Sequence, residues 1–130
     1  MGQGELERVL LVEDEQDIQT IALMALESVG GLTVQVCSSG REALAKVAEF
    51  GPDLIVLDVM MPEMDGPTTL GELRKLPEAS ETPVVFLTAK VQAQEVSQYK
   101  ELGAADVISK PFDPMTLPQT LRDIYARRGD

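Results

Sequence analysis

The chain has 130 residues, a length typical of one domain, and 44% of them are hydrophobic. Its formal net charge of -11 disfavours direct binding to nucleic acid and to anionic membranes. With no histidine and one cysteine, it has no Ser-His-Asp triad, no histidine metal ligand and no internal disulfide. Because no apolar run approaches the ~18 residues of a membrane span, we expect a cytoplasmic protein without membrane insertion. We expect one domain over residues 1–130, with a core from about 8 to 127.

Five short apolar runs, typical of buried strands, occur in chain order at Val9–Val12, Leu32–Val36, Leu54–Leu57, Val84–Leu87 and Val107–Ile108. A stretch with helical spacing of its apolar residues follows each run, at Ile18–Val29, Ala43–Ala48, Thr68–Leu76, Val91–Leu102 and Leu117–Arg127. Gly30-Gly31 and Gly51-Pro52 end the first two helices, and Ser38 or Ser39 can cap the second. The fourth helix is polar and offers little apolar surface.

Five strands that alternate with five helices indicate βαβ units, and therefore a parallel sheet covered by helices on both faces. A doubly wound sheet of this kind binds its ligands beyond the carboxyl ends of its strands. Candidate functional residues should therefore follow the apolar runs directly. Acids, a hydroxyl and a lysine are found there, in Glu13-Asp14-Glu15, Asp58, Thr88-Ala89-Lys90 and Ser109-Lys110-Pro111-Phe112.

The acidic residues predict a metal site. Carboxylates gathered in a small space repel each other, which raises a pKa or requires a counter-ion. With no histidine and a single cysteine, the expected ion is a hard cation, Mg²⁺ with Mn²⁺ as the alternative. Its predicted ligands are the carboxylates of Glu13, Asp14 and Asp58 and the backbone carbonyl of Met60. The competing interpretation is that Glu13 and Asp14 only cap the next helix, and this is the one we prefer for Glu15 and Asp17.

Asp58 is the predicted nucleophile. It follows four apolar residues directly, so it emerges from a buried strand, whereas Asp65 precedes a glycine and reads as a turn former. Beside a metal that neutralises phosphate charge, the carboxylate of Asp58 can form an acyl phosphate. Lys110 can neutralise one phosphoryl oxygen and the hydroxyl of Thr88 can donate to another.

The chain from about Arg8 to Arg127 resembles a receiver domain of two-component response regulators, of the stand-alone, chemotaxis-regulator-like kind. The resemblance is carried by the motifs LLVEDE, LIVLDVMMPEMDG, VVFLTAK and GAADVISKPF in this order and spacing. It implies a flavodoxin-like sheet with strand order 2-1-3-4-5. It also implies Mg²⁺-dependent phosphorylation of Asp58 by a histidine kinase or histidine phosphotransfer protein. Thr88 and Lys110 take the switch and phosphate-contact roles, with Ala89 and Pro111 as their neighbours.

The expected function is phosphorelay signalling, in which phosphorylation switches a surface formed by the fourth helix, fifth strand and fifth helix. Ala104, Ala105 and Val107 should leave room there for a downstream protein, which the sequence does not identify. We expect a monomer or a phosphorylation-dependent dimer, and no enzyme activity beyond self-phosphorylation and dephosphorylation. A fragment of a larger regulator or hybrid kinase is the alternative to a stand-alone receiver.

Three features, at four positions, depart from the family pattern. Glu13 stands where many receivers have an aspartate, and Val107 stands where they have a switch aromatic. Met60 cannot orient hydrolytic water strongly, since a thioether is a weak acceptor, and Lys90 takes the second position that influences this water.

An aspartyl phosphatase would need an acid in place of Met60. A flavin carrier would need a phosphate-binding loop where Glu13-Asp14-Glu15 repels phosphate. A receiver that is not phosphorylated is disfavoured, because acceptor, hydroxyl and lysine are all present.

Overall fold

The computed structural model describes residues 5–128. Its centre is a sheet of five parallel strands in the order β2-β1-β3-β4-β5, which confirms the predicted topology. The strands are β1 (Arg8–Val12), β2 (Thr33–Cys37), β3 (Leu54–Asp58), β4 (Val84–Thr88) and β5 (Asp106–Ser109). Each is four or five residues long, as expected for the short apolar runs.

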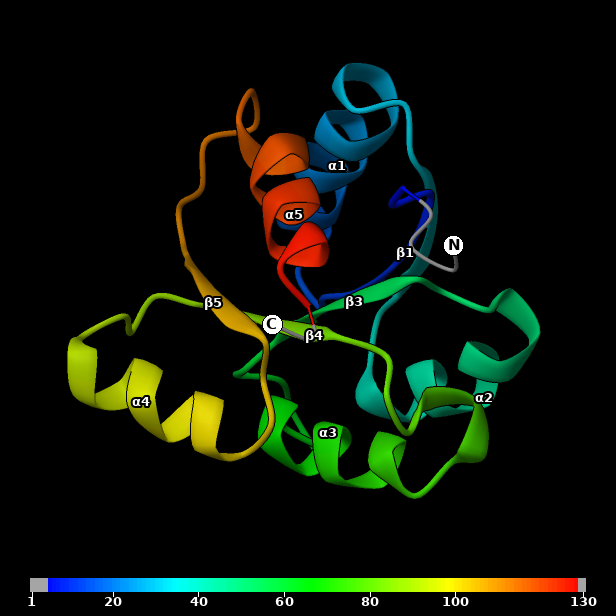
Figure 1. The fold of residues 1–130 in the computed structure, drawn as a ribbon, viewed down its shortest axis with the longest axis vertical. Coiled ribbons are helices and arrows are strands. Elements are labelled where there is room, and N and C mark those ends of the chain that lie inside the picture. The colour runs from blue at the N-terminus through cyan, green and yellow to red at the C-terminus, as the bar shows by residue number, and fades with distance from the viewer. Residues whose placement is uncertain (1–4, 129–130) are drawn as a thin grey trace.

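Helices cover both faces of the sheet, with α1 and α5 on one side and α2, α3 and α4 on the other (Figure 1). They are α1 (Gln16–Met24), α2 (Gly40–Phe50), α3 (Gly66–Arg74), α4 (Ala93–Glu101) and α5 (Leu117–Ala126). A π-helical segment, η1 (Ala25–Val29), continues α1, and a short 3-10 helix, η2 (Pro77–Ala79), precedes β4. Within residues 5–128, none of these helices is long and apolar enough to cross a membrane.

Alternate strand residues face the two helical layers and form two cores. On β1, Leu10 and Val12 pack in the core that α2 and α3 cover, whereas Val9 and Leu11 pack in the core that α1 and α5 cover. All four are fully or almost fully buried. The near-continuous apolar strands predicted from the sequence therefore reflect burial on both faces.

Local signals set the ends of the helices. The hydroxyl of Ser39 accepts a hydrogen bond from the backbone N–H of Glu42 at 3.0 Å, which confirms Ser39 as the cap of α2. Asp65 caps α3 by accepting from the N–H of Thr68 at 2.9 Å. Gly51 ends α2 with φ of 64°, a left-handed conformation that favours glycine.

The fourth helix offers little apolar surface, as its polar sequence predicted. No residue of α4, all of which the structure describes, is buried. Its half-buried Tyr99 packs edge-on against Phe86 of β4, with ring centroids 5.1 Å apart. Ala104, which was expected to line an open surface, is instead buried in the core, because the chain turns inward after Gly103. Ala105 is exposed, so only this alanine lies on the expected surface.

Candidate functional site

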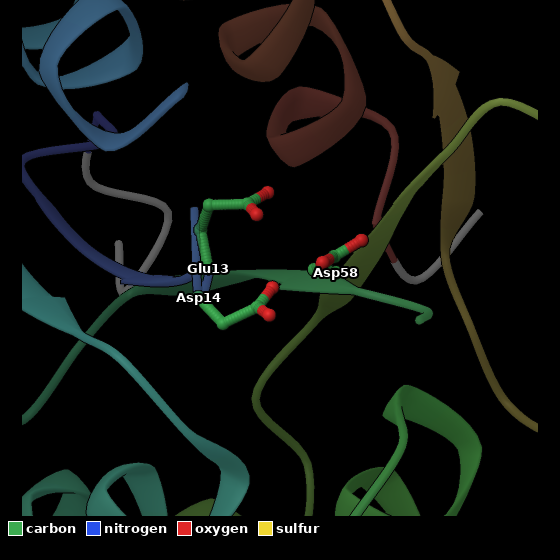
Figure 2. A group of neighbouring side chains, drawn as sticks. All are labelled: Glu13, Asp14 and Asp58. Carbon is green, nitrogen blue, oxygen red and sulfur yellow. The ribbon is translucent and has the colours of Figure 1, made fainter. Parts of the chain in front are cut away.

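Three carboxylates converge at the carboxyl edge of the sheet (Figure 2). Glu13 and Asp14 follow β1, and Asp58 is the last residue of β3, the strand paired with β1. One carboxylate oxygen from each of these three residues lies within 4.8 Å of the others. Glu13 and Asp58 are 0% and 2% exposed, so two of the charges are almost fully removed from water. The parallel register therefore brings together the acids that the sequence predicted as metal ligands.

Lys110 lies against this acidic group. Its ammonium nitrogen is 3.0 Å from Oε1 of Glu13, 3.1 Å from Oδ1 of Asp58 and 3.7 Å from Oε1 of Glu15. The backbone N–H of Lys110 donates to the carbonyl of Thr88 at 2.9 Å, which holds the β5–α5 turn against β4. The Lys110–Pro111 peptide bond is cis. Lys110 is therefore a site residue and not a solvated surface lysine.

The structure corrects the interpretation of Glu15. It occupies the N-cap position of α1, but its side chain makes no capping hydrogen bond among the described residues. Its carboxylate instead faces the ammonium of Lys110. Asp17 lies in the first turn of α1 with an exposed side chain, as the capping interpretation expects.

The proton affinities of the site follow from burial and from charge. Burial raises the pKa of Glu13, and contact with Lys110 opposes this rise only in part. Burial raises the pKa of Asp58 for the same reason, again against the effect of Lys110. Burial alone would lower the pKa of Lys110, but its contacts with Glu13 and Asp58 raise it overall. Burial therefore makes it unfavourable for Glu13 and Asp58 to carry their negative charges, and Lys110 offsets only part of this cost.

The carboxylate oxygens of Glu13, Asp14 and Asp58 are suitable ligands for a hard divalent cation. Within residues 5–128, Oδ1 of Asp14 and Oδ2 of Asp58 are buried and receive no hydrogen bond. Oε1 of Glu13 also lacks a hydrogen bond, so its short contact with Lys110 is an ion pair. Buried carboxylate oxygens without donors are costly, and a cation bound through oxygen would satisfy them. Met60 is 68% exposed, and a ligand role for its carbonyl stays a prediction.

Thr88 ends β4 one residue beyond Leu87, the register partner of Asp58. It is 3% exposed, and its hydroxyl oxygen accepts a hydrogen bond from the N–H of Lys90 at 3.1 Å. Its own O–H remains a donor. Ala89 follows with an exposed side chain, and Pro111 is exposed beside Lys110. The predicted switch and phosphate-contact residues thus border the same edge of the sheet.

Gly66 packs against the backbone of Asp58, a contact that the sequence indicates only in part. The Asp65-Gly66 pair indicates a turn, and the N–H of Gly66 does donate to the carbonyl of Val59 at 2.8 Å. A Cβ atom on Gly66 would also lie 2.6 Å from the carbonyl oxygen of Asp58. Glycine is therefore needed here for close approach to the backbone that carries Asp58.

A doubly wound sheet with three carboxylates and a lysine at its carboxyl edge defines a flavodoxin-like protein with an acidic cluster that could hold a metal ion. The sequence model of the family described as "Response regulator receiver domain" matches residues 9–122, and the chain belongs to this family. It is therefore a receiver domain of two-component systems.

Curated relatives are similar along most of the chain. It is 40% identical over 121 residues to the transcriptional regulatory protein TrcR of Mycobacterium tuberculosis, covering 92% of this chain and 46% of that protein. It is 38% identical over 128 residues to the probable transcriptional regulator ycf27 of Pyropia yezoensis, covering 98% of this chain and 51% of that protein. The chain thus spans about half the length of the curated relatives it matches.

Solved structures agree with the fold. The chemotaxis response regulator CheY4 of Vibrio cholerae superposes with a TM-score of 0.84 at 33% identity, covering 92% of this chain and 98% of that one. The receiver domain of a signal transduction histidine kinase from Syntrophus aciditrophicus gives a TM-score of 0.76 at 31% identity, covering 95% of both chains.

Proposed function

We propose that the chain is a phosphorylation switch in which Asp58 accepts a phosphoryl group from a histidine kinase or histidine phosphotransfer protein. The placement of Asp58 carries this proposal. The residue is buried at the end of β3, its Oδ1 contacts Lys110, and its Oδ2 has no donor within the described residues. A carboxylate held between a cation and other acids in this way is suited to receive a phosphoryl group that a metal ion neutralises.

The transfer forms a bond between a carboxylate oxygen of Asp58 and phosphorus. It breaks the P–N bond of the phosphohistidine, whose imidazole leaves with the electron pair and takes up a proton. Lys110 supplies positive charge to one phosphoryl oxygen, and the hydroxyl of Thr88 donates to another. Mg²⁺, held by Glu13, Asp14 and Asp58 with the carbonyl of Met60, supplies further charge neutralisation when it is bound.

The phosphodonor docks beside the lysine in this proposal. An apolar cavity of about 250 Å³ is lined by Lys110, Pro111 and Phe112 of the β5–α5 turn and by Ile18 and Ile21 of α1. Ile21 is 42% exposed, although it is a large apolar side chain. An apolar surface next to the acceptor would seat the apolar face of a donor helix and place its histidine near Asp58.

The chemistry of this chain ends with gain and loss of the phosphoryl group, so we do not assign it turnover of another substrate. The added charge of roughly 1.5–2 units draws Thr88 and Lys110 toward the phosphoryl oxygens and shifts a two-state surface on α4, β5 and α5. On this surface Asp106 of β5 forms salt bridges with Lys100 of α4 at 3.7 Å and with Arg127, which follows α5, at 3.5 Å. The net charge of -11 favours a protein partner over nucleic acid.

Labelling with acetyl phosphate tests the acceptor. Wild-type protein with Mg²⁺ should gain one phosphoryl group by intact mass, EDTA should prevent this, and Asp58→Asn should not be labelled. Asp17→Asn changes an exposed acid at the start of α1 and should be labelled normally. Stoichiometric labelling of Asp58→Asn would refute the assignment.

The docking step is tested separately by a phosphotransfer profile against purified histidine kinases of the source organism. Ile21→Glu should slow transfer from the cognate kinase and leave labelling by acetyl phosphate unchanged, because the small donor needs no apolar surface. Normal transfer from the kinase to Ile21→Glu would refute docking at this cavity.

A further inference from the structure

The side-chain amide of Gln19 on α1 turns back to the acidic turn after β1. Its Nε2 donates to the main-chain carbonyl of Glu13 at 2.5 Å and to the hydroxyl oxygen of Ser38 at 3.0 Å. An amide nitrogen carries two hydrogens, so it can make both bonds at once. Gln19 thereby connects the turn that carries Glu13 and Asp14 with the turn that precedes α2.

The carbonyl of Glu13 lies where strand pairing ends. The N–H of Glu13 still donates to the carbonyl of Cys37 at 3.0 Å, beside the last register pair of β1 and β2, Val12 with Cys37. The carbonyl on the other side of the same residue is held by the side chain of Gln19. The sheet therefore positions Glu13 from one side, and a glutamine positions it from the other.

This contact controls the peptide that leads into Asp14. The peptide group between Glu13 and Asp14 is planar. Holding the carbonyl oxygen of Glu13 therefore also sets the direction of the N–H of Asp14 and the position of its Cα. The turn needs such a restraint, since the carboxylates of Glu13, Asp14 and Asp58 lie within 4.8 Å of one another and repel. Oδ1 of Asp14 is buried and receives no hydrogen bond from the described residues, so hydrogen bonding does not hold that oxygen.

The second acceptor of Gln19 is itself anchored. The N–H of Ser38 donates to Oε1 of Glu42 at 2.7 Å, and Oε2 of Glu42 pairs with Lys46 at 3.0 Å. The neighbouring Ser39 caps α2. The amide of Gln19 is therefore held by two acceptors, the carbonyl of Glu13 and the hydroxyl of Ser38, whose residues are themselves restrained. These two bonds fix the orientation of the Gln19 side chain.

We infer that Gln19 is the positioning residue of the acidic pair: through the carbonyl of Glu13 it holds Glu13 and Asp14 in the arrangement that binds the divalent cation. The cation itself rests on the function proposed above. The competing explanation is that Gln19 only fastens α1 to the β2–α2 turn. In that case its loss would lower stability and leave both the turn and the cation affinity unchanged.

Gln19→Met separates the two explanations, because methionine has a similar size and no donor. Backbone amide NMR spectra of the ¹⁵N-labelled protein, recorded first without metal and then during a titration with MgCl₂, report both properties. We expect the amide resonances of Asp14 and Glu15 to shift in the metal-free variant. We expect the Kd for Mg²⁺ to rise about tenfold, the size typical of losing a residue that orients a metal ligand.

Two further variants serve as controls. Thr20→Val removes a hydroxyl one position along α1 that donates to the carbonyl of Gln16 at 3.0 Å, and it should leave the Kd unchanged. Ser38→Ala removes the second acceptor and should weaken binding less than Gln19→Met. Because the two residues share one contact, the effect of the double variant should be smaller than the sum of the single effects.

Unchanged resonances of Asp14 and Glu15 in metal-free Gln19→Met would overturn the inference. A Kd within about twofold of wild type, together with a lower Tm, would overturn it as well, because that is the signature of a fastening role. If the resonances shift but the wild-type protein binds no Mg²⁺, the positioning role stands and the metal assignment of the proposed function fails.

Discussion

The ammonium nitrogen of Lys110 lies 3.1 Å from Oδ1 of Asp58, joining the carboxyl ends of the edge strand β5 and the central strand β3. The same ammonium contacts buried Glu13, so one cation is shared by two buried carboxylates, with exposed Glu15 farther away. The site therefore keeps more buried negative charge than Lys110 neutralises. Such a site favours binding of an ion and costs folding stability while that ion is absent.

Asp58→Asn should therefore stabilise the protein in the absence of divalent cations. Burial raises the pKa of Asp58, so ionisation at neutral pH disfavours the folded state, and a neutral amide removes this penalty. We expect a gain of about 1 kcal/mol in the free energy of unfolding, measured by urea denaturation in EDTA. Asp17→Asn, an exposed change, should have little effect. A less stable Asp58→Asn protein in EDTA would contradict this account.

Met60→Asn should shorten the lifetime of the acyl phosphate. Met60 lies two residues after Asp58, the proposed site of phosphorylation, and its thioether accepts hydrogen bonds only weakly, so it orients attacking water poorly. An amide at this exposed position can hold a water molecule near the phosphoryl group. After removal of excess acetyl phosphate, loss of the phosphoryl mass should be slow in wild type and severalfold faster in the variant. Met60→Leu should match wild type, and equal rates for Asn and Met would exclude this role.

The placement of Asp58 and Lys110 at one edge of the sheet could be predicted because their signals are local. Asp58 follows an apolar strand directly, and Lys110 follows another, so the rule that sites lie at the carboxyl ends of parallel strands is enough to bring them together. Strand order is not encoded in any single segment and came only from the family resemblance. The five-strand pattern and the Ser39 cap were likewise predictable, since each depends on neighbouring residues.

The features that could not be predicted depend on how helices are rotated and on where turns lead. Gln19 faces the β1–α1 turn because of the rotation of α1, which the sequence does not reveal. Glu15 has the sequence position of a capping acid, but the approach of Lys110 along a different strand decides its contact. Ala104 is buried because the chain turns inward after Gly103. The π-helical segment Ala25–Val29 keeps an apolar pattern that also fits an α-helix.

Glu63→Asn should stabilise the turn between β3 and α3. Glu63 has φ of 70°, the left-handed region, where an ordinary side chain is strained and asparagine is better tolerated. Its side chain is exposed, so little packing is lost. We expect a gain of about 0.5 kcal/mol in the free energy of unfolding by urea. Glu63→Ala keeps a Cβ atom at positive φ and should show no gain. Equal stabilisation by alanine would show that the charge of Glu63, and not its backbone, is responsible.

Glu42→Gln should reveal a pH-dependent contribution to stability from the start of α2. The carboxylate of Glu42 accepts a hydrogen bond from the N–H of Ser38 at 2.7 Å and pairs with Lys46 at 3.0 Å. The hydrogen bond from Ser38, followed by the contact with Lys46, lowers the pKa of Glu42 below its ordinary 4.5.

Because the folded pKa is the lower one, the unfolded chain takes up a proton first as the pH falls. The stabilisation is therefore complete above about pH 4.5 and is lost below it. At about pH 7 the variant should be less stable by about 0.5 kcal/mol, since both side chains of the pair are partly exposed to water. The difference should shrink when urea denaturation is repeated well below pH 4.5. Glu78→Gln, an exposed change in η2, should show no such trend. A difference between wild type and Glu42→Gln that stays constant with pH would mean that shape, and not charge, accounts for the role of Glu42.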